Sequence, residues 1–499
     1  MEYSSGLRLH KPVHFYHRRI LITTFAEHSE QKWCVSPTTH PPQTACDRSH
    51  FDALGHTIVP ATIPTGTMLF YGNDSSASPP ALDWLAFDFE HSYIFCRADC
   101  YVTSYMASRP LHLLYLDGAS ASKLQDGALD VQDILIWGKP SPDKFFDEDE
   151  RIQLMCEWGM QFGLDGFVRM EMHLYVSKVC HCVAWPDPSF PTIRSEVMMC
   201  DFSDGLKLIS KSNLILHDAE NADVDAPVPE FPVKVPPGWR GSVPNFNAVS
   251  VELLNAGSWH DRPPGETRIR VDYSRAVTFY DRSLTSLVDA RRGLRRRQHR
   301  VGNISASDFA HVMEEVREVL VRDSADTGSG IDWGSATHVI VERYGGRLEL
   351  LNYILDPESF PNVTHQAAIA REQLLIMLNP YLLAQAVPEP GADPAANTSW
   401  VVPIAQRCAR TQTLGIPLEQ LTKQERRILD AIEDVLHEIC RVLTEMWIDA
   451  FDIEAASEKH SRTAVQSWRQ SVQDLMAWLD WAVWERCNPA CGPEVRLIL

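Results

Sequence analysis

The feature that most constrains the fold is a proline-rich run at residues 222–245, ADVDAPVPEFPVKVPPGWRGSVPN. Proline fixes the backbone φ angle and has no N–H to donate, so such a run suits neither a helix nor the interior of a sheet. It is typical of an extended linker. Because the hydrophobic patterning before this run differs from the patterning beyond residue 300, we predict two parts with separate cores.

The part before the linker, residues 51–221, has the pattern of a mixed α+β domain. Short stretches rich in β-branched and aromatic residues predict strands at 67–71, 101–106, 111–116, 166–170 and 196–201. Helices are predicted near 90–96 and at 148–162, the second beginning at an acidic DEDE stretch that suits a helix N-terminus. The polar, His-rich residues 1–50 predict a disordered or loose arm.

The part beyond the linker is predicted to become an all-α domain at residues 300–499, after a mixed segment at 246–299 with a strand at 267–273. Helical periodicity predicts helices at 307–321, 365–378, 421–451 and 463–486. In the third, Thr422 and Glu425 form a capping box. Its apolar stripe consists of Ile428, Ile432, Val435, Ile439, Val442 and Met446.

Two features allow a functional and a structural interpretation. The basic cluster of the mixed segment contains Arg291, Arg292, Arg295, Arg296, Arg297 and Arg300. It suits a localisation signal or an anion-binding patch, but a solvated helix or loop that balances the acidic surface is favoured. The Trp-rich last helix suits a membrane surface or a partner. A core-facing helix is favoured, because Asp474, Asp480 and Glu485 give no basic polar face.

The net charge of -20 makes the chain a poor general binder of nucleic acid or anionic membranes, so we expect no nucleic-acid partner. The sequence contains no run of 18 or more apolar residues, so no transmembrane segment is predicted. The apolar ILITTFA after Arg18 and Arg19 is a poor signal peptide, which favours a cytoplasmic location. Sequons at Asn73, Asn303, Asn362 and Asn397 keep a secretory route open.

Twelve cysteines include three close sets, Cys96 with Cys100, Cys180 with Cys182, and Cys487 with Cys491. None has the C-x2-C spacing that is usual for structural zinc, so no metal is expected. In a cytosolic protein most of these cysteines would be free and buried. A Cys487–Cys491 disulfide is the alternative for a secreted protein.

Several segments of the N-terminal part occur in a suggestive order: GTMLFYGN, WLAFDFEHSYIFC, YVTSYMASRPLHLLYLDG, GLDGFVRM and SEVMMCDFSDGLKLI. This order resembles the ADP-ribosyltransferase fold. In that family a strand ends in an aromatic-His-Gly or Arg-Gly element, a YFA…Y segment follows, and a glutamate opens a late strand with an aspartate five residues on. The late element is here EVMMCD, with Glu196 and Asp201.

The resemblance implies NAD as the substrate, and ADP-ribosyl transfer or NAD glycohydrolysis as the reaction. Glu196 would stabilise the positive charge that develops on the ribose, and Tyr93 would stack on nicotinamide. The backbone of Gly72 would bond the carboxamide. Tyr71 departs from the family's His or Arg, and 174–195 resembles an insertion. Both departures fit a degenerate relative.

The chain as a whole resembles a family of uncharacterised proteins from filamentous fungi, a resemblance that implies no activity. It is carried by DWLAFDFEHSYIFCR, FGLDGFVRMEM, THVIVERYGGRLELLNYIL and WLDWAVWERCNPACGPE. The alternative to an enzyme is therefore a non-catalytic interaction or structural protein, which binds a protein partner through its helical C-terminal domain.

Overall fold

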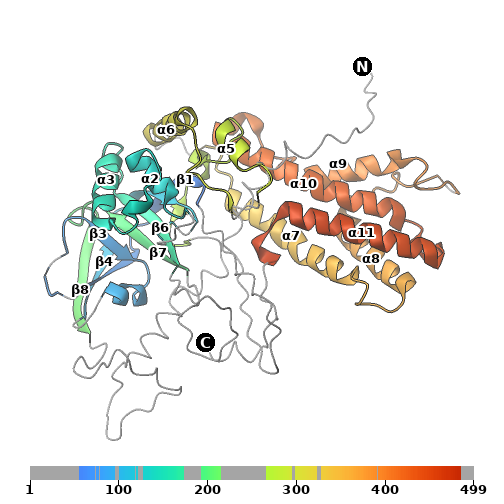
Figure 1. The fold of residues 1–499 in the computed structure, drawn as a ribbon, viewed down its shortest axis with the longest axis horizontal. Coiled ribbons are helices and arrows are strands. Elements are labelled where there is room, and N and C mark those ends of the chain that lie inside the picture. The colour runs from blue at the N-terminus through green and yellow to red at the C-terminus, as the bar shows by residue number, and fades with distance from the viewer. Residues whose placement is uncertain are drawn as a thin grey trace, which may run out of the picture. The chain divides into compact units, whose positions relative to one another are not determined.

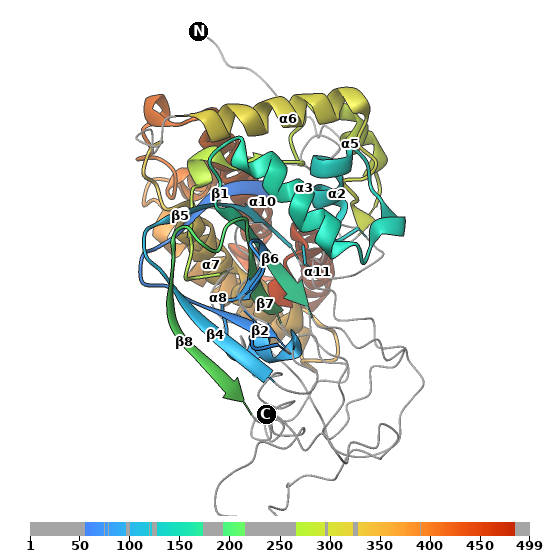
Figure 2. The same ribbon diagram turned by 90° about the vertical axis from the view of Figure 1, so that its left-hand side faces the viewer.

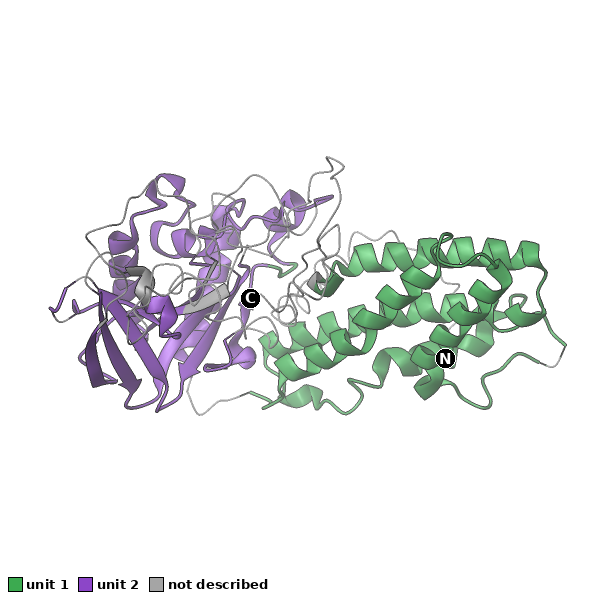
Figure 3. Ribbon diagram, turned by 90° about the horizontal axis from the view of Figure 1, so that it is seen from below, with its two compact units in different colours: residues 1–26, 280–282, 328–484 green, residues 27–279, 283–327, 485–499 purple. Residues whose placement is uncertain are grey.

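The computed structural model describes residues 55–73, 75–77, 79–95, 100–118, 120–121, 127–172, 193–214, 266–294, 298–322, 328–389 and 391–484. These residues form two compact units, which Figure 3 colours separately. The sheet unit includes the described residues of 55–279 and 283–322, and the helical unit includes residues 280–282 and 328–484. The predicted arm at 1–50 and linker at 222–245 lie outside the described residues.

Ten strands form one curled sheet within the described part of the sheet unit (Figures 1 and 2). They are β1 (Thr57–Ile63), β2 (Met68–Asn73), β3 (Asp83–Ala86), β4 (Cys100–Ala107), β5 (Leu111–Leu116), β6 (Gly166–Met172), β7 (Ile193–Met199), β8 (Leu206–Leu214), β9 (Arg270–Val271) and β10 (Val277–Thr278). The strand order is β10-β1-β5-β6-β7-β3-β2-β4-β8, and β9 pairs with β1. Among the strand pairs of the described residues, only β5 and β6 run parallel, and the crossover between them carries two helices.

The five strands predicted before the linker are confirmed as β2, β4, β5, β6 and β7, the last beginning three residues earlier than predicted. Strands β1 and β8 were not predicted. Pro60 interrupts the pattern of β1, and the second half of β8, LKLISKSNL, is mostly polar, with Lys211 between two serines. The strand predicted at 267–273 is reduced to the two residues of β9, because a 3-10 helix, η5 (Tyr273–Arg275), follows at once.

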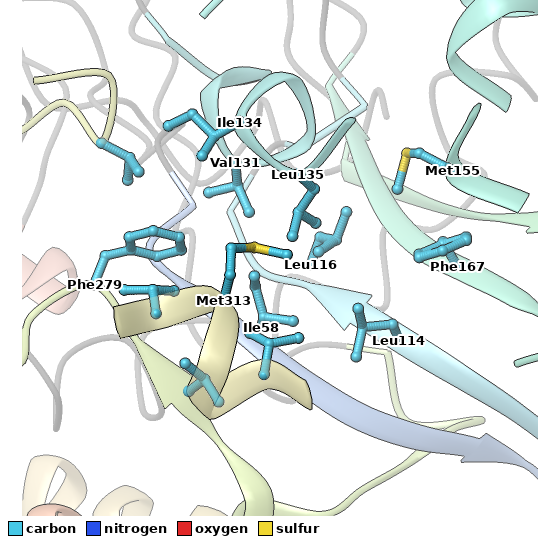
Figure 4. Packing of buried hydrophobic residues seen from close by; sticks show 14 of the residues in the cluster. Ile58, Leu114, Leu116, Val131, Ile134, Leu135, Met155, Phe167, Phe279 and Met313 are labelled. Atoms are coloured by element: carbon cyan, nitrogen blue, oxygen red, sulfur yellow. The ribbon is translucent and has the colours of Figure 1, made fainter. Parts of the chain in front are cut away.

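The helices of the sheet unit are α2 (Asp130–Trp137), α3 (Glu148–Met160), α5 (Thr285–Ala290) and α6 (Ala306–Val321), with short 3-10 turns η2 (Glu90–Phe95) and η3 (Pro142–Lys144). Helices α2, α3 and α6 contribute side chains to a core cluster with one face of the sheet, where Val131, Met155 and Met313 meet Leu114 and Phe167 (Figure 4). A second cluster, which includes Leu69, Tyr71, Val168 and Val197, lies on the opposite face.

Helix α6 changes the expected division of the chain. Its apolar face, including Val312, Val316 and Val319, was predicted to belong to the helical domain from residue 300 onwards. These side chains are buried in the cluster on the sheet. Apart from residues 280–282, the described part of the helical unit therefore begins at residue 328 and not at 300, because helical periodicity alone does not say whether a helix packs on helices or on a sheet.

The helical unit consists of α7 (Trp333–Ile354), α8 (Val363–Leu378), α9 (Val402–Arg410), α10 (Lys423–Ala450) and α11 (Glu458–Leu479). Short 3-10 helices join or flank them at η7 (Asn379–Tyr381), η8 (Thr398–Val401), η9 (Leu418–Gln420), η10 (Ile453–Ala455) and η11 (Ala482–Trp484). The predicted capping box of α10 is confirmed, and all six residues of its apolar stripe are buried. The core-facing interpretation of α11 is also confirmed, since Trp468, Val472 and Leu475 are buried.

Each unit contains at least one disulfide between described residues. Cys156 of α3 is bonded to Cys200, which follows β7, and Cys408 of α9 is bonded to Cys440 of α10. All four residues are buried. The expectation that the cysteines are free is wrong for these four. None of the described helices combines the length and apolar character that a membrane span requires.

A buried carboxylate, Asp117, fastens the start of β1 to the end of β5. Its Oδ1 accepts the backbone N–H groups of His56 and Thr57, both at 2.7 Å. A Cβ at Gly55 would lie 2.1 Å from the Asp117 carbonyl oxygen, so only glycine permits this approach. Burial raises the pKa of Asp117 to about 7, although the two N–H bonds oppose the shift.

Asp117 should make the unfolding free energy depend on pH. A carboxyl whose pKa is raised by folding binds its proton more tightly in the folded state, so stability falls as pH rises from about 4 to 7. Asp117→Asn keeps the acceptor for both N–H groups and removes the ionisation. In urea unfolding, we expect the unfolding free energy of the variant to rise relative to that of wild type by up to about 4 kcal/mol as the pH increases from 4 to 7.5. Parallel pH profiles would contradict this assignment.

Candidate functional site

Arg169 and Glu196 form a buried ion pair at the centre of the sheet. Arg169 in β6 lies directly opposite Glu196 in β7. Its Nε and Nη2 atoms donate to Glu196 Oε1 at 2.9 and 2.5 Å. Arg169 is 1% exposed and Glu196 is 4% exposed, so water does not screen the pair. The carboxylate that sequence reasoning assigned to catalysis thus contacts a cation.

The remaining donors of Arg169 reach the two helices of the crossover. Its Nη1 donates to Gln132 Oε1 of α2 at 2.7 Å, and its Nη2 donates to Glu148 Oε2 of α3 at 2.8 Å. The guanidinium also lies over the Trp84 ring, 3.8 Å from the centroid. One side chain therefore connects three strands with two helices.

A second arginine extends this arrangement. Arg151 of α3 is fully buried, and its Nη1 donates to Asp133 Oδ1 at 2.5 Å. Its Nε donates to Glu148 Oε1 at 3.0 Å, so Glu148 bridges the two arginines. We name the six residues Arg169, Glu196, Gln132, Glu148, Arg151 and Asp133 the arginine network.

The charges of the arginine network nearly balance, with two arginines against three carboxylates. Burial alone would lower the pKa of Arg169, but Glu148 and Glu196 outweigh it and raise the pKa above its ordinary value. Burial raises the pKa of Asp133, against the opposing effect of Arg151. Arg169 therefore stays cationic, and a buried cation needs the carboxylates that surround it.

The predicted cofactor residues do not all share a face with Glu196. Glu196 lies opposite Ala86 of β3, and Ala86 lies opposite Phe70 of β2. Directly opposed residues share a face, and the side-chain period of a strand is two, so Gly72 is on the Glu196 face and Tyr71 is not. Tyr71 belongs to the cluster on the opposite face. Tyr71 and Glu196 therefore do not line one cleft.

The side chain of Tyr71 contacts other side chains of the sheet unit. Its hydroxyl donates to Asp83 Oδ2 at 2.9 Å, and its ring meets Phe202 edge-on. Burial raises the pKa of Tyr71, and the nearby carboxylate of Asp83 adds to the shift. The hydroxyl thus stays protonated and serves as a hydrogen-bond donor between β2 and β3.

Gly72 permits a close approach of backbone to backbone. A Cβ at this position would lie 1.9 Å from the carbonyl oxygen of Ser92, which belongs to η2. Tyr93 is the next residue of η2, and its side chain lies outside the described parts. The structure therefore brings Gly72 and η2 together, and the contact alone accounts for the glycine.

Asp201, the second acidic residue of the family motif, is exposed and caps a turn. Its Oδ1 accepts from both the backbone N–H and the hydroxyl of Ser203, at 2.7 and 2.6 Å. These bonds lower the pKa of Asp201. Asp201 therefore follows β7 outside the arginine network.

Part of the basic cluster differs from the solvated helix or loop that was favoured, although Arg292 is exposed and pairs with Asp289 as that interpretation expects. Arg291 is buried and donates to the carbonyl oxygen of Phe279 at 2.7 Å. Arg300 donates to both carboxylate oxygens of Asp130 at 3.0 and 2.8 Å. At least these two arginines stabilise the sheet unit. The described residues contain no group of three or more His, Cys, Asp or Glu that could hold a metal ion.

Sequence reasoning identified Glu196 but missed Arg169, Gln132 and Arg151. The signal for Arg169 was present in GFVRMEM, where a charged residue interrupts an apolar strand. A charge at such a position requires a buried partner. The partner on the neighbouring strand is set by register, which a single sequence does not specify.

Removal of one partner of the ion pair should destabilise the sheet unit strongly. Arg169→Met leaves Glu196 buried without its cation, and we expect the unfolding free energy to fall by about 3–5 kcal/mol. The double variant Arg169→Met with Glu196→Leu should lose less than the sum of the two single losses, as measured by urea unfolding. Additive losses would contradict a direct ion pair.

The chain is similar in sequence to proteins from yeast. A family model described as the YPL277C N-terminal domain matches residues 97–183, which include β4, β5, α2, α3 and β6. The chain is 25% identical to the uncharacterized protein YPL277C of Saccharomyces cerevisiae in an alignment of 440 residues, which covers 72% of this chain and 82% of that protein. It is 27% identical to the uncharacterized yeast protein YOR389W in an alignment of 312 residues, which covers 47% of this chain and 46% of that protein.

These similarities support the resemblance to uncharacterised fungal proteins. They do not support the resemblance to ADP-ribosyltransferases, and no solved structure matches the chain.

Proposed function

We propose that the chain is a non-catalytic interaction protein whose helical unit binds a protein partner through α7. The observation that carries the proposal is an apolar stripe on the exposed face of this helix. Val339, Leu350 and Tyr353 are 52%, 45% and 61% exposed. Large apolar side chains that lie together on an exposed surface are typical of interaction sites.

The three residues fall on one face because of their spacing. At 3.6 residues per turn, a step of 11 residues from Val339 to Leu350 is about three turns, and Tyr353 is one further turn along. Gly346, also exposed, lies between them on the same face and leaves the backbone accessible. The other face of α7 is buried, with Tyr344 and Leu348 in the core. The exposed face of α7 thus carries three large apolar side chains beside the charged residues Glu342 and Arg347, which are also exposed.

The partner that suits this stripe is an amphipathic helix. A second helix can pack its own apolar side chains between Val339, Leu350 and Tyr353, as helices do within cores. Tyrosine is favoured at such interfaces, because its ring buries apolar area while its hydroxyl remains accessible to water. The sheet unit would serve as a stable module in this proposal, with the arginine network holding α2 and α3 on the sheet.

The alternative is an NAD-dependent ADP-ribosyltransferase, or a degenerate relative, with Glu196 as the catalytic carboxylate and Tyr71, Gly72 and Tyr93 at the cofactor. A carboxylate that stabilises a ribosyl cation must face the substrate in the transition state. Two observations favour the interaction protein instead. Glu196 accepts two bonds from Arg169, and Tyr71 belongs to the cluster on the other face of the sheet.

The two candidate functions differ in whether the protein binds and hydrolyses NAD. We expect calorimetry to detect no NAD binding by the full chain, and we expect no NAD hydrolysis by wild type or by Tyr71→His, which restores the family's residue. Glu196→Gln should lower stability, whereas Glu438→Gln, a control carboxylate paired with Arg441 in the helical unit, should have little effect. NAD hydrolysis that falls about 100-fold to 1000-fold in Glu196→Gln would instead establish the enzyme.

The stripe can be tested by a photocrosslinker in the living cell. Tyr353→p-benzoylphenylalanine places a reactive ketone on α7, and the same change at Gln466, an exposed polar residue of α11, is the control. We expect a discrete cross-linked species from position 353 alone, and its loss when Leu350→Glu is added, because a charge in the stripe must be desolvated on binding. Equal labelling at both positions would contradict a specific partner.

A further inference from the structure

Three of the four sequon asparagines are exposed at the junctions between elements. Asn303 precedes α6, Asn362 precedes α8, and Asn397 precedes η8. A glycan at such a position extends into solvent and removes no buried contact. The sequon hydroxyls are Ser305, Thr364 and Ser399.

Two of these asparagines also cap a helix with the oxygen of the amide. Asn362 Oδ1 accepts the N–H groups of Thr364 and His365 at 2.9 and 3.1 Å, and Asn397 Oδ1 accepts the N–H of Ser399 at 3.0 Å. These bonds do not use Nδ2, the atom to which a glycan is attached. The cap and the glycan are therefore compatible on the same side chain.

Asn73 differs from the other three. It is half-buried in β2, its backbone is in register with Tyr101 of β4, and its Nδ2 donates to the Tyr71 hydroxyl at 3.4 Å. A glycan on this nitrogen would replace its bond to the Tyr71 hydroxyl and would have to fit against the face of the sheet that carries Tyr71. Asn73 is therefore an internal control within the same chain.

The two disulfides point to the same compartment by an independent route. Disulfides form and persist in the secretory pathway and outside the cell, whereas cytosolic thiols are kept reduced. Cys156–Cys200 and Cys408–Cys440 lie in different units, with Cα atoms 5.3 and 5.8 Å apart. Those separations lie within the range that a disulfide bridges.

We propose that the chain matures in the secretory pathway, where Asn303, Asn362 and Asn397 receive N-linked glycans and both cysteine pairs are oxidised. In each transfer, a bond forms between Nδ2 and the first carbon of an oligosaccharide, the bond from that carbon to a lipid pyrophosphate breaks, and the amide loses one proton. In each oxidation, two thiols give two electrons and two protons to a disulfide-bearing oxidoreductase. This inference is independent of the proposed partner and opposes the cytoplasmic location that the sequence favours.

The glycans can be counted on the full chain expressed in yeast cells. We expect an endoglycosidase that removes N-linked glycans to lower the apparent mass on a denaturing gel, and three variants each to remove one step of that change. Asn303→Gln removes the first acceptor. Thr364→Ala and Ser399→Ala abolish the other two sequons and leave the capping oxygens of Asn362 and Asn397 in place.

Matched controls separate a lost glycan from a lost fold. Thr364→Ser retains the sequon and should retain the glycan, and Asn73→Gln should change nothing on the gel. A chain that the endoglycosidase does not shift would overturn the glycan assignment, as would a shift that survives all three variants together.

The disulfides are tested on the same material by alkylation under denaturing conditions. We expect Cys156, Cys200, Cys408 and Cys440 to be protected from a maleimide reagent before reduction and labelled after it, as read by peptide mass spectrometry. Labelling of all four before reduction, from cells in which thiols were trapped with acid, would overturn the proposed oxidising compartment.

Discussion

The contact between Arg169 and Glu196 organises the sheet unit, because the surrounding elements are arranged around a charge that cannot reach water. A guanidinium that is 1% exposed must find its partners inside the protein. Glu196 supplies one from the adjacent strand, Gln132 and Glu148 supply two from the crossover helices, and Trp84 covers a face of the group. The geometry of α2 and α3 on the sheet is thus specified by directional bonds, which apolar packing alone would not specify.

The same contact explains why Glu196 is a misleading residue in the sequence. An acidic residue inside an apolar strand occurs both in active sites and in buried ion pairs, and the two have the same local pattern. They differ in what lies on the neighbouring strand. The register of β6 against β7 puts Arg169 opposite Glu196, and this pairing joins residues 27 positions apart. The local sequence pattern does not specify the register between two strands that far apart in the chain. Glu196 was therefore identified from the sequence, but its pairing with Arg169 was not.

Other features were predictable because their causes are local. The capping box of α10 needs only Thr422 and Glu425 three residues apart, and the stripe behind it needs only helical spacing. Strands β4 and β5 were found through their own composition. Helix α6 was found as a helix but assigned to the helical domain, because Val312 and Val316 would suit either core. Tyr71 was expected at a ligand, but whether alternate residues of β2 face helices or the second core cluster depends on the whole sheet.

Glu425 shows how a local motif becomes a tertiary contact. Its carboxylate accepts the backbone N–H of Thr422, which completes the capping box, and also the indole N–H of Trp333 at 3.1 Å. Trp333 is the first residue of α7 and is fully buried. The N-termini of α7 and α10 are therefore joined through one carboxylate. Burial alone would raise the pKa of Glu425, but the hydrogen bonds from Ser329, Thr422 and Trp333 outweigh burial and lower it. Because the start of α7 is fixed in this way, the exposed stripe further along the helix is held in a defined orientation, which would reduce the conformational entropy that α7 loses on binding the proposed partner.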